Sequence, residues 1–181
     1  MSPMSKDSSL LVRDADDSDL PAIQNIYAFY VRHSVATFEE MPPNVDDLLA
    51  RRKAILEVRL PYLVATRGRD IVGYAYATFY RLRPAYRYTV EDSVYVADTF
   101  RSQGVGSALL SAVIERCEQG GWRQMIAVIG DSANAGSIAL HRRFGFNPMG
   151  TLKAVGFKLG QWVDTVLMQR TLGEGDRTLP R

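Results

Sequence analysis

The stretch VADTFRSQGVGSALLSAVIERC, residues 96–117, decides how the rest of the chain is interpreted. An extended apolar run ends in a polar turn, two glycines stand at Gly104 and Gly106, and an amphipathic helix follows. Glycine weakens a helix, so both positions must need the absence of a side chain. Either the chain makes a tight strand-to-helix turn here, or bare backbone N–H groups receive a phosphate.

The residues around the two glycines leave both explanations open. A helix N-terminus has about four unpaired N–H groups and carries roughly half a positive charge. Arg101 adds a side-chain cation to this end. The spacing differs from a Walker-A loop, because no Gly-Lys-Ser/Thr follows, and from a dinucleotide-binding fingerprint, because Leu109 stands where a third glycine is needed.

Outward from this stretch, the hydrophobic period alternates between that of strands and that of helices. Strands are expected at residues 10–15, 61–66, 70–80, 86–96 and 123–130, with two more over 149–170. Helices are expected at residues 14–34, 45–60, from the glycine loop to Gly120, and from 134 to Gly145. The order predicts an α/β (α+β) fold: one domain with a mixed central sheet of about six to seven strands and helices on both faces. We expect this domain over residues 10–172, between a flexible N-terminus, 1–9, and a flexible tail, 173–181.

The composition excludes several classes of function. The chain has 181 residues, 46% hydrophobic and 23% charged, with a net charge of +2 and no basic run interleaved with aromatics, which argues against nucleic-acid binding. Neither a secretory signal nor a membrane-length apolar run is present, so we expect a cytoplasmic protein without membrane association. Two scattered histidines and one cysteine form no zinc site, so no metal is expected. Cys117 falls on an apolar helix stripe, where a thiol acts as a small hydrophobic side chain.

The context of the glycine loop points to a known family. About thirty residues beyond the loop, NAGSIALHRRFGF opens with Asn134 and ends in Phe-Gly-Phe. With these features the chain resembles the GNAT superfamily of N-acetyltransferases. The segments RYTVEDSVYV, AVIG, NAGSIALH and VGFKLGQWVD, in this order, look like its phosphinothricin acetyltransferase branch, which includes the methionine sulfone and sulfoximine acetyltransferases. The resemblance runs from about Leu11 to Arg170.

The resemblance implies acetyl-CoA as the co-substrate. The Arg-x-x-Gly-x-Gly loop would hold the pyrophosphate, the splayed strand before it would pair with the pantetheine arm, and an amide of that strand would polarise the thioester carbonyl. The residues implied in binding the coenzyme are Val94, Tyr95, Val96, Arg101, Ser102, Gln103, Gly104, Val105, Gly106, Ser107 and Asn134.

The resemblance also implies the catalytic residues. Glu91 matches the general base of the family; without the family, it could equally be a solvated strand residue. Strand alternation places Glu91, Ser93 and Tyr95 on one face and Asp92 on the other. His141 lies seven residues after Asn134 on the same helix face, and matches a second proton-handling residue or a substrate contact. The tyrosine that the branch places near Leu110 is missing here, which leaves the proton donor of the leaving thiolate open.

The candidate acceptor site favours an anionic acceptor. Arg81 and Arg83 precede Glu91, and an arginine fork suits the carboxylate of an amino-acid substrate, although each could also belong to a solvated loop. Phe38 and Lys158 match pocket residues of the branch, with ordinary packing as the alternative for Phe38. Trp162 could lie in the core or in a dimer interface.

The sequence therefore favours an enzyme that acetylates the α-amine of a small amino-acid analogue. A protein or peptide N-acetyltransferase, an aminoglycoside acetyltransferase and a non-catalytic acetyl-CoA sensor remain as alternatives. The first two would favour acidic surroundings, which the basic loop with Arg81 and Arg83 does not provide. The family resemblance further implies a homodimer formed through the C-terminal strands.

Overall fold

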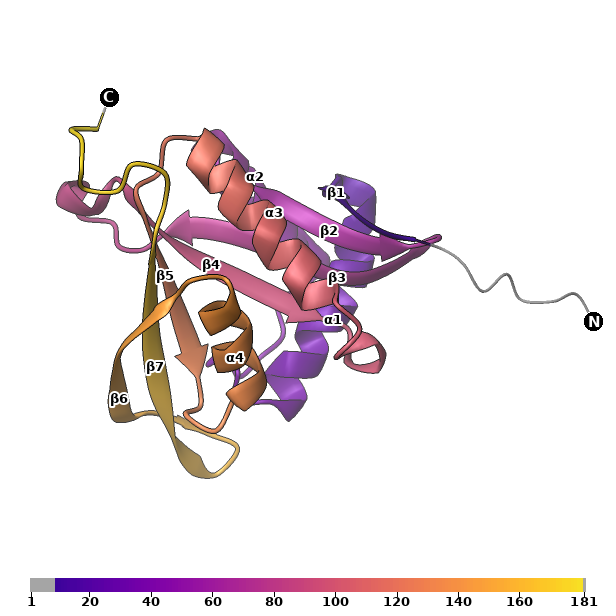
Figure 1. Ribbon diagram of the computed structural model, residues 1–181. Coiled ribbons are helices and arrows are strands. Elements are labelled where there is room, and N and C mark those ends of the chain that lie inside the picture. Colours follow the sequence, from indigo (N-terminus) through magenta and orange to yellow (C-terminus); the bar gives the residue numbers. More distant parts are fainter. Residues whose placement is uncertain (1–8, 181) are drawn as a thin grey trace, which may run out of the picture.

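The structure, a computed structural model, describes residues 9–180, so nearly all of the predicted flexible N-terminus lies outside the described residues (Figure 1). The seven strands are β1 (Leu10–Asp14), β2 (Tyr62–Arg67), β3 (Asp70–Phe79), β4 (Thr89–Val96), β5 (Gln124–Gly130), β6 (Asn147–Lys158) and β7 (Gln161–Thr171). The helices are α1 (Leu20–His33), α2 (Val45–Glu57), α3 (Val105–Gln119) and α4 (Ala135–Arg143), with short 3₁₀ turns η1 (Asp17–Asp19), η2 (Pro84–Tyr86) and η3 (Asp98–Phe100). The predicted order of elements is confirmed.

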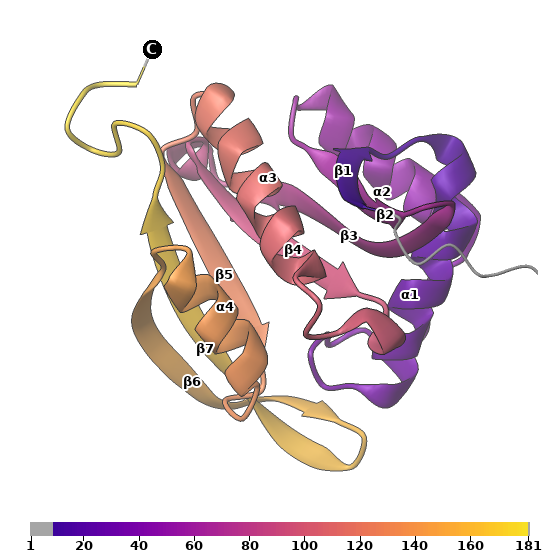
Figure 2. The same ribbon diagram turned by 45° about the vertical axis from the view of Figure 1, so that its right-hand side comes forward.

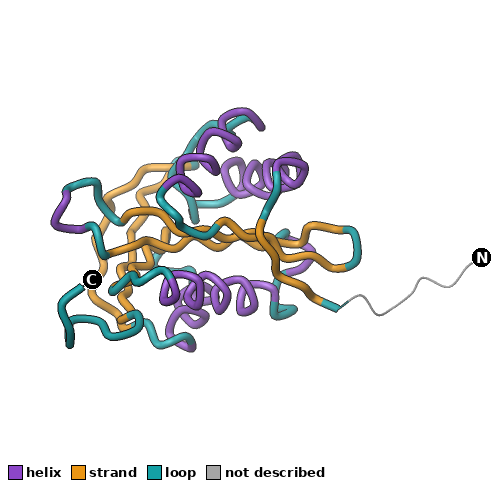
Figure 3. Tube along the Cα trace, turned by 90° about the horizontal axis from the view of Figure 1, so that it is seen from above, coloured by secondary structure: helices purple, strands orange, loops and turns teal. Residues whose placement is uncertain are grey.

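One mixed sheet organises the molecule. Its strand order is β1-β2-β3-β4-β5-β7-β6, and every neighbouring pair is antiparallel except β4 and β5. Helices cover both faces of the sheet (Figure 3). Helix α1 packs on β3 and β4, while α3 lies across β1 to β4 on the other face. The predicted fold class is confirmed.

The parallel pair β4–β5 comes apart part-way along its length. Pairing runs from Thr89↔Gln124 to Asp92↔Ala127. Beyond Ala127, β5 continues alongside β7 while β4 continues alongside β3, so the two strands diverge (Figure 2). The V-shaped gap that results exposes backbone at the centre of the sheet.

Local sequence explains most element ends. Asp16 and Asp19 form a capping box ahead of α1, and Asn44 forms another with Asp47 ahead of α2. Cys117 is fully buried on the inner stripe of α3, as predicted.

Several element bounds differ from the prediction, most of all at α1, which begins at Leu20 after the η1 turn and not at residue 14. Strand β4 begins three residues later than expected, because Pro84 starts a 3₁₀ turn in which the Arg87 N–H donates to the Pro84 carbonyl. In the tail after β7, the Arg123 guanidinium donates to the Gly175 and Leu179 carbonyls.

Candidate functional site

A groove of about 1000 Å³ occupies the gap between β4 and β5. Its walls come from the ends of β4 and β5, the loop after α1, the glycine loop before α3, and one side of α4. The groove therefore brings together segments that are far apart in the sequence but were predicted to act together, from Val94 to Asn134.

The glycine loop ends in an open helix N-terminus. Gly104 has φ 82°, a left-handed conformation that glycine adopts without strain, and a Cβ built there would meet no heavy atom of the described chain within 4 Å. Asn44 and Asn134 cap α2 and α4 with their side chains, whereas no side chain among residues 9–180 caps α3. The first N–H groups of α3 therefore have no side-chain acceptor among these residues, as at helix N-termini that can bind an anion.

Gly106 serves close packing instead. A Cβ at this position would lie 3.3 Å from the Leu140 side chain of α4 and 3.6 Å from Val96. The two glycines of the opening motif therefore meet different structural requirements, a left-handed backbone at Gly104 and close packing at Gly106. Both line the groove.

Two arginines lie at this end of the groove. Arg101 forms an ion pair with Asp98 at 3.2 Å and lies 5.3 Å from the centre of the Tyr30 ring. Arg143, at the end of α4, reaches across to α3 and donates to the Ser107 hydroxyl at 2.7 Å. Arg143 was not predicted from the sequence, and it is the second groove-lining arginine in the described part of the chain. Gln103 lies on the outer side of the loop, where it accepts from Arg67.

The open edge of β4 directs backbone groups into the gap. The Ala97 N–H donates to Val72 on the β3 side. Because successive residues of a strand point their backbone groups to alternate sides, Val96 and Val94 turn theirs toward the separated β5. The Val96 carbonyl accepts a hydrogen bond from the Tyr30 hydroxyl at 2.7 Å, which is consistent with this direction.

Glu91 lies on the face of β4 that α1 covers, one residue before the last pair of β4 with β5, and it adjoins the groove-lining Asp92 without lining the groove itself. It pairs with Thr78 across β3, and Tyr76 and Ser93 share its face. Burial, helped by the neighbouring Asp92 charge, raises the pKa of Glu91 to about 7. A carboxylate with this pKa is suited to accept a proton near neutral pH.

His141 lies on the opposite face of β4 from Glu91. Its Nε2 is 2.9 Å from Asp92 Oδ2, and its Nδ1 is 2.8 Å from the Ser137 carbonyl oxygen. Both side chains are almost completely buried at the floor of the groove. Sequence reasoning placed Asp92 on the correct face but did not connect it to His141, which is 49 residues away.

Comparison with known proteins agrees with this geometry. The Acetyltransferase (GNAT) family profile matches residues 22–146. The chain belongs to the GNAT family of acetyltransferases. It is 56% identical to a phosphinothricin N-acetyltransferase from Alcaligenes faecalis, over 93% of this chain and 86% of that protein. It is 43% identical to an L-methionine sulfoximine/L-methionine sulfone acetyltransferase from Pseudomonas aeruginosa, over 91% and 95% of the two chains.

A solved structure of a relative carries the coenzyme. The phosphinothricin acetyltransferase from Sinorhizobium meliloti, in complex with acetyl-CoA, is 47% identical and superposes with a TM-score of 0.92 over 95% of this chain and 93% of that chain. The predicted family membership and enzyme class are confirmed: the protein is an N-acetyltransferase.

Lys158 has a different place in this acetyltransferase from the one predicted. It is only 4% exposed, and its ammonium donates to the Ser34 and Thr37 carbonyls at 2.7 and 2.6 Å. Lys158 therefore fastens the loop after α1 to the β6–β7 hairpin, and most of its hydrogen-bonding capacity is used within the protein. Phe38 lies in the same loop, where its ring covers Gly156 so closely that a Cβ there would clash at 2.5 Å.

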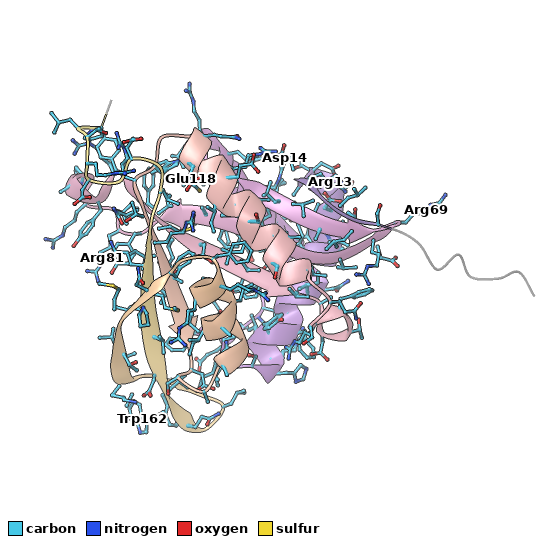
Figure 4. The ribbon with its side chains drawn as sticks, in the orientation of Figure 1. Arg13, Asp14, Arg69, Arg81, Glu118 and Trp162 are labelled. Carbon is cyan, nitrogen blue, oxygen red and sulfur yellow. The ribbon has the colours of Figure 1, made fainter. Side chains whose placement is uncertain are left out.

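Arg81 and Arg83 are not brought to the groove of this chain. Both are exposed in the loop between β3 and β4, and Arg81 stacks against the rings of Tyr80 and Tyr86. In Figure 4, Arg81 points outward at the flank of the sheet. The sequence suggested an arginine fork next to Glu91. Within a single chain of this protein, Arg81 and Arg83 do not form it.

The remaining candidates, Asn134, Leu110 and Trp162, lie in three different parts of the molecule. Asn134 lines the groove and caps α4, accepting from the Ser137 N–H at 3.2 Å. Leu110 is fully buried in the core, so this position supplies no acid. Trp162 is 69% exposed at the tip of the β6–β7 hairpin (Figure 4).

Across residues 9–180, no helix has both the length and the apolar character needed to cross a membrane. The same residues contain no cluster of three or more His, Cys, Asp or Glu side chains that could ligate a metal.

Proposed function

We propose that this acetyltransferase transfers the acetyl group of acetyl-CoA to the α-amine of a small amino-acid analogue of the phosphinothricin, methionine sulfone or methionine sulfoximine type. The observation that carries the proposal is one continuous groove with an uncapped helix N-terminus at one end and, next to its lining residue Asp92, a carboxyl of raised pKa, Glu91. The names of the relatives support the acceptor class.

The groove fits the coenzyme. The N–H groups of Val105, Gly106 and Ser107, with Arg101 and Arg143, would hold the diphosphate, because an uncapped helix end and two guanidinium groups supply donors and positive charge. Ser102 and Gly104 complete the loop, both with positive φ. Asn134 and the open edge of β4 from Val94 to Val96 would hold the pantetheine arm, and its thioester would reach the point where β4 and β5 part.

The chemistry assigned to Glu91 is that of a general base. It removes a proton from the acceptor ammonium, directly or through a water, and the free amine attacks the thioester carbonyl carbon. The N–H of Val94 or Val96 polarises the carbonyl oxygen, an effect of about 3 kcal/mol for a well-placed donor. The C–N bond forms, the attacked nitrogen gives up its second proton to water, the C–S bond breaks, and the thiolate takes a proton. His141, on the coenzyme face of β4, is assigned as the second proton-handling residue.

The acceptor would enter beside Phe38, in the loop that Lys158 fastens. We assign Lys158 to positioning this wall rather than to direct contact with the acceptor, because its ammonium already serves two carbonyls. We also propose a homodimer, because apolar side chains gather exposed on the terminal hairpin.

Release of free thiol from acetyl-CoA tests the proposal. The panel contains phosphinothricin, methionine sulfone, methionine sulfoximine, a peptide with a free N-terminus and an aminoglycoside. We expect release only with the amino-acid analogues, and loss of turnover in Glu91→Gln with coenzyme binding retained. Turnover with the peptide alone would move the assignment to a protein acceptor, and binding of acetyl-CoA without turnover of any amine would indicate a sensor.

A further inference from the structure

The pair formed by Asp92 and His141 lies where β4 and β5 separate. Asp92 is the last β4 residue paired with β5, opposite Ala127. Its side chain is 1% exposed and that of His141 is 6% exposed, yet both border the groove. The pair thus ties α4 to the floor of the groove where the thioester would end.

The hydrogen bonds of His141 determine how many protons the pair holds. The Ser137 carbonyl oxygen can only accept, so Nδ1 carries a hydrogen. Nε2 and Asp92 Oδ2 lie 2.9 Å apart, a distance at which two unprotonated acceptors would repel each other. A second proton must therefore lie between them.

The surroundings favour keeping this proton on the imidazole. Burial lowers the pKa of His141, but its bonds to Asp92 and to the Ser137 carbonyl outweigh burial, so its pKa lies above the usual value. Asp92 Oδ1 has no hydrogen-bond partner in the described part of the chain, so the carboxylate acts on His141 alone.

Other ionisable groups around the pair do not replace Asp92. From α3, Cys117 faces it as a neutral thiol, because burial raises the pKa of Cys117 to about 12. Glu91 adjoins Asp92 but lies on the other face of β4, and Arg143 on α4 donates to Ser107. The Phe146 ring packs nearly perpendicular to the imidazole, with 5.0 Å between ring centres.

We propose that Asp92 is a positioning residue that keeps His141 doubly protonated at the floor of the groove, ready to supply a proton to the leaving thiolate. The inference rests on the proposed acetyl transfer. As the C–S bond breaks, the sulfur takes the proton from His141 Nε2 and leaves a neutral imidazole. The nitrogen loses two protons in all. Glu91 takes the first from the ammonium before attack, and the second leaves the attacked nitrogen as the amide forms and passes through water in the groove to His141, which restores the proton of the pair.

Nuclear magnetic resonance of histidine-labelled protein tests the resting state without any substrate. The chain has two histidines, His33 and His141, so the second signal serves as an internal reference. At pH 7.5 we expect both ring nitrogens of His141 to carry hydrogen. In Asp92→Asn the amide can donate to Nε2, so we expect this nitrogen to lose its hydrogen while the His33 signal is unchanged. An unprotonated Nε2 in the wild type overturns the proposal, even if the variant does not fold.

Kinetics test the consequence. With the acceptor from the panel, Asp92→Asn should lower kcat by about a hundredfold, the usual size of a lost proton transfer, and change KM for acetyl-CoA by less than about threefold. Asp19→Asn is the matched control, because Asp19 is a buried carboxylate, 6% exposed, that is ion-paired to Arg13 at 2.6 Å and lies outside the groove lining. It should lower the melting temperature but leave kcat and the His141 signal unchanged.

The outcomes separate this proposal from the proposed function. An unchanged kcat in Asp92→Asn, or a loss expressed only in KM, would reduce the pair to a packing contact and overturn the positioning role. If no acceptor gives turnover, acetyl transfer fails as the function, while the resonance spectrum still decides whether Asp92 holds a proton on His141.

Discussion

Burial of the Glu91 carboxyl suits its proposed function but destabilises the folded protein. Its carboxyl is held among aromatic and hydroxyl side chains on one face of β4, where burial raises its pKa from 4.5 to about 7. The folded protein therefore binds the proton of Glu91 more tightly than the unfolded chain does. The contribution of this group to stability is complete below about pH 4.5 and is lost as the pH rises through 7.

The activity should follow the same ionisation with the opposite sign. Only the carboxylate accepts a proton, so we predict that kcat/KM rises with pH up to about 7 and then levels. Steady-state rates of thiol release between pH 5 and 9 measure this profile. In Glu91→Gln the remaining activity should lack the inflection near pH 7. Urea unfolding should show that the stability of the variant relative to the wild type increases between pH 5 and pH 8, by on the order of 1–3 kcal/mol. An equal difference at both pH values would contradict the raised pKa.

Lys158 illustrates a charged residue used for structure. Replacing it with Met keeps the aliphatic stem but leaves the Ser34 and Thr37 carbonyls without their donor, which costs roughly 1–3 kcal/mol per buried group. We predict that Lys158→Met lowers the free energy of unfolding by about 2–4 kcal/mol and raises KM for the acceptor, as the loop wall loosens.

A neighbouring lysine supplies the comparison for this experiment. Lys153 lies on the same strand, is 74% exposed and pairs with Asp164. Lys153→Met should change the urea midpoint little, because exposed ion pairs contribute less than about 1 kcal/mol. Equal losses in the two variants would argue against the fastening role of Lys158.

At the scale of elements, the N-terminus of α3 and the C-terminus of α4 meet where we propose that the diphosphate binds. Arg143 joins the two helices through Ser107, and no carboxylate of residues 9–180 pairs with it. We predict that Arg143→Ala weakens CoA inhibition about tenfold, as loss of a charge-assisted contact implies, and leaves inhibition by pantetheine unchanged because pantetheine has no phosphate. Competition against acetyl-CoA measures both constants.

Arg142 provides the matched variant, because it is exposed, adjacent on the same helix and outside the groove lining. Arg142→Ala should leave both inhibition constants within about twofold, the change expected from long-range charge alone under screening. If both variants weaken inhibition by CoA equally, the overall positive charge and not a specific contact accounts for the effect.

The elements also show what a sequence can predict. Period and capping residues gave all seven strands and four helices, and alternation placed Glu91 and Asp92 on opposite faces correctly. What failed depended on contacts between distant segments. The bond from Asp92 to His141 spans 49 residues and that from Lys158 to Thr37 spans 121, and neither leaves a local pattern. Arg81 appeared adjacent to the base in sequence, but an aromatic stack in the β3–β4 loop holds it outside the groove.

At the scale of the whole molecule, the β6–β7 hairpin presents an unusual surface. Strand β6 forms an edge of the sheet, and nearly all its residues are exposed. Phe157 and Trp162 pair across the hairpin with ring centres 5.1 Å apart, at 58% and 69% exposure. The exposed apolar side chains of this hairpin are Met149, Leu152, Val155, Phe157, Leu159 and Trp162. A group of exposed apolar side chains on one hairpin is typical of an interaction surface.

We therefore predict that two copies associate through this hairpin. A stable interface buries about 800 Å² on each partner and uses aromatic anchors, which Phe157 and Trp162 would supply. Sedimentation velocity should give twice the mass of one chain for the wild type and a shift toward single chains for Trp162→Ser. Leu82→Ser is the matched control, because Leu82 is 92% exposed but lies outside this hairpin. A wild type that sediments as a single chain at micromolar concentration would contradict the dimer, and the apolar hairpin would then need another partner to cover it.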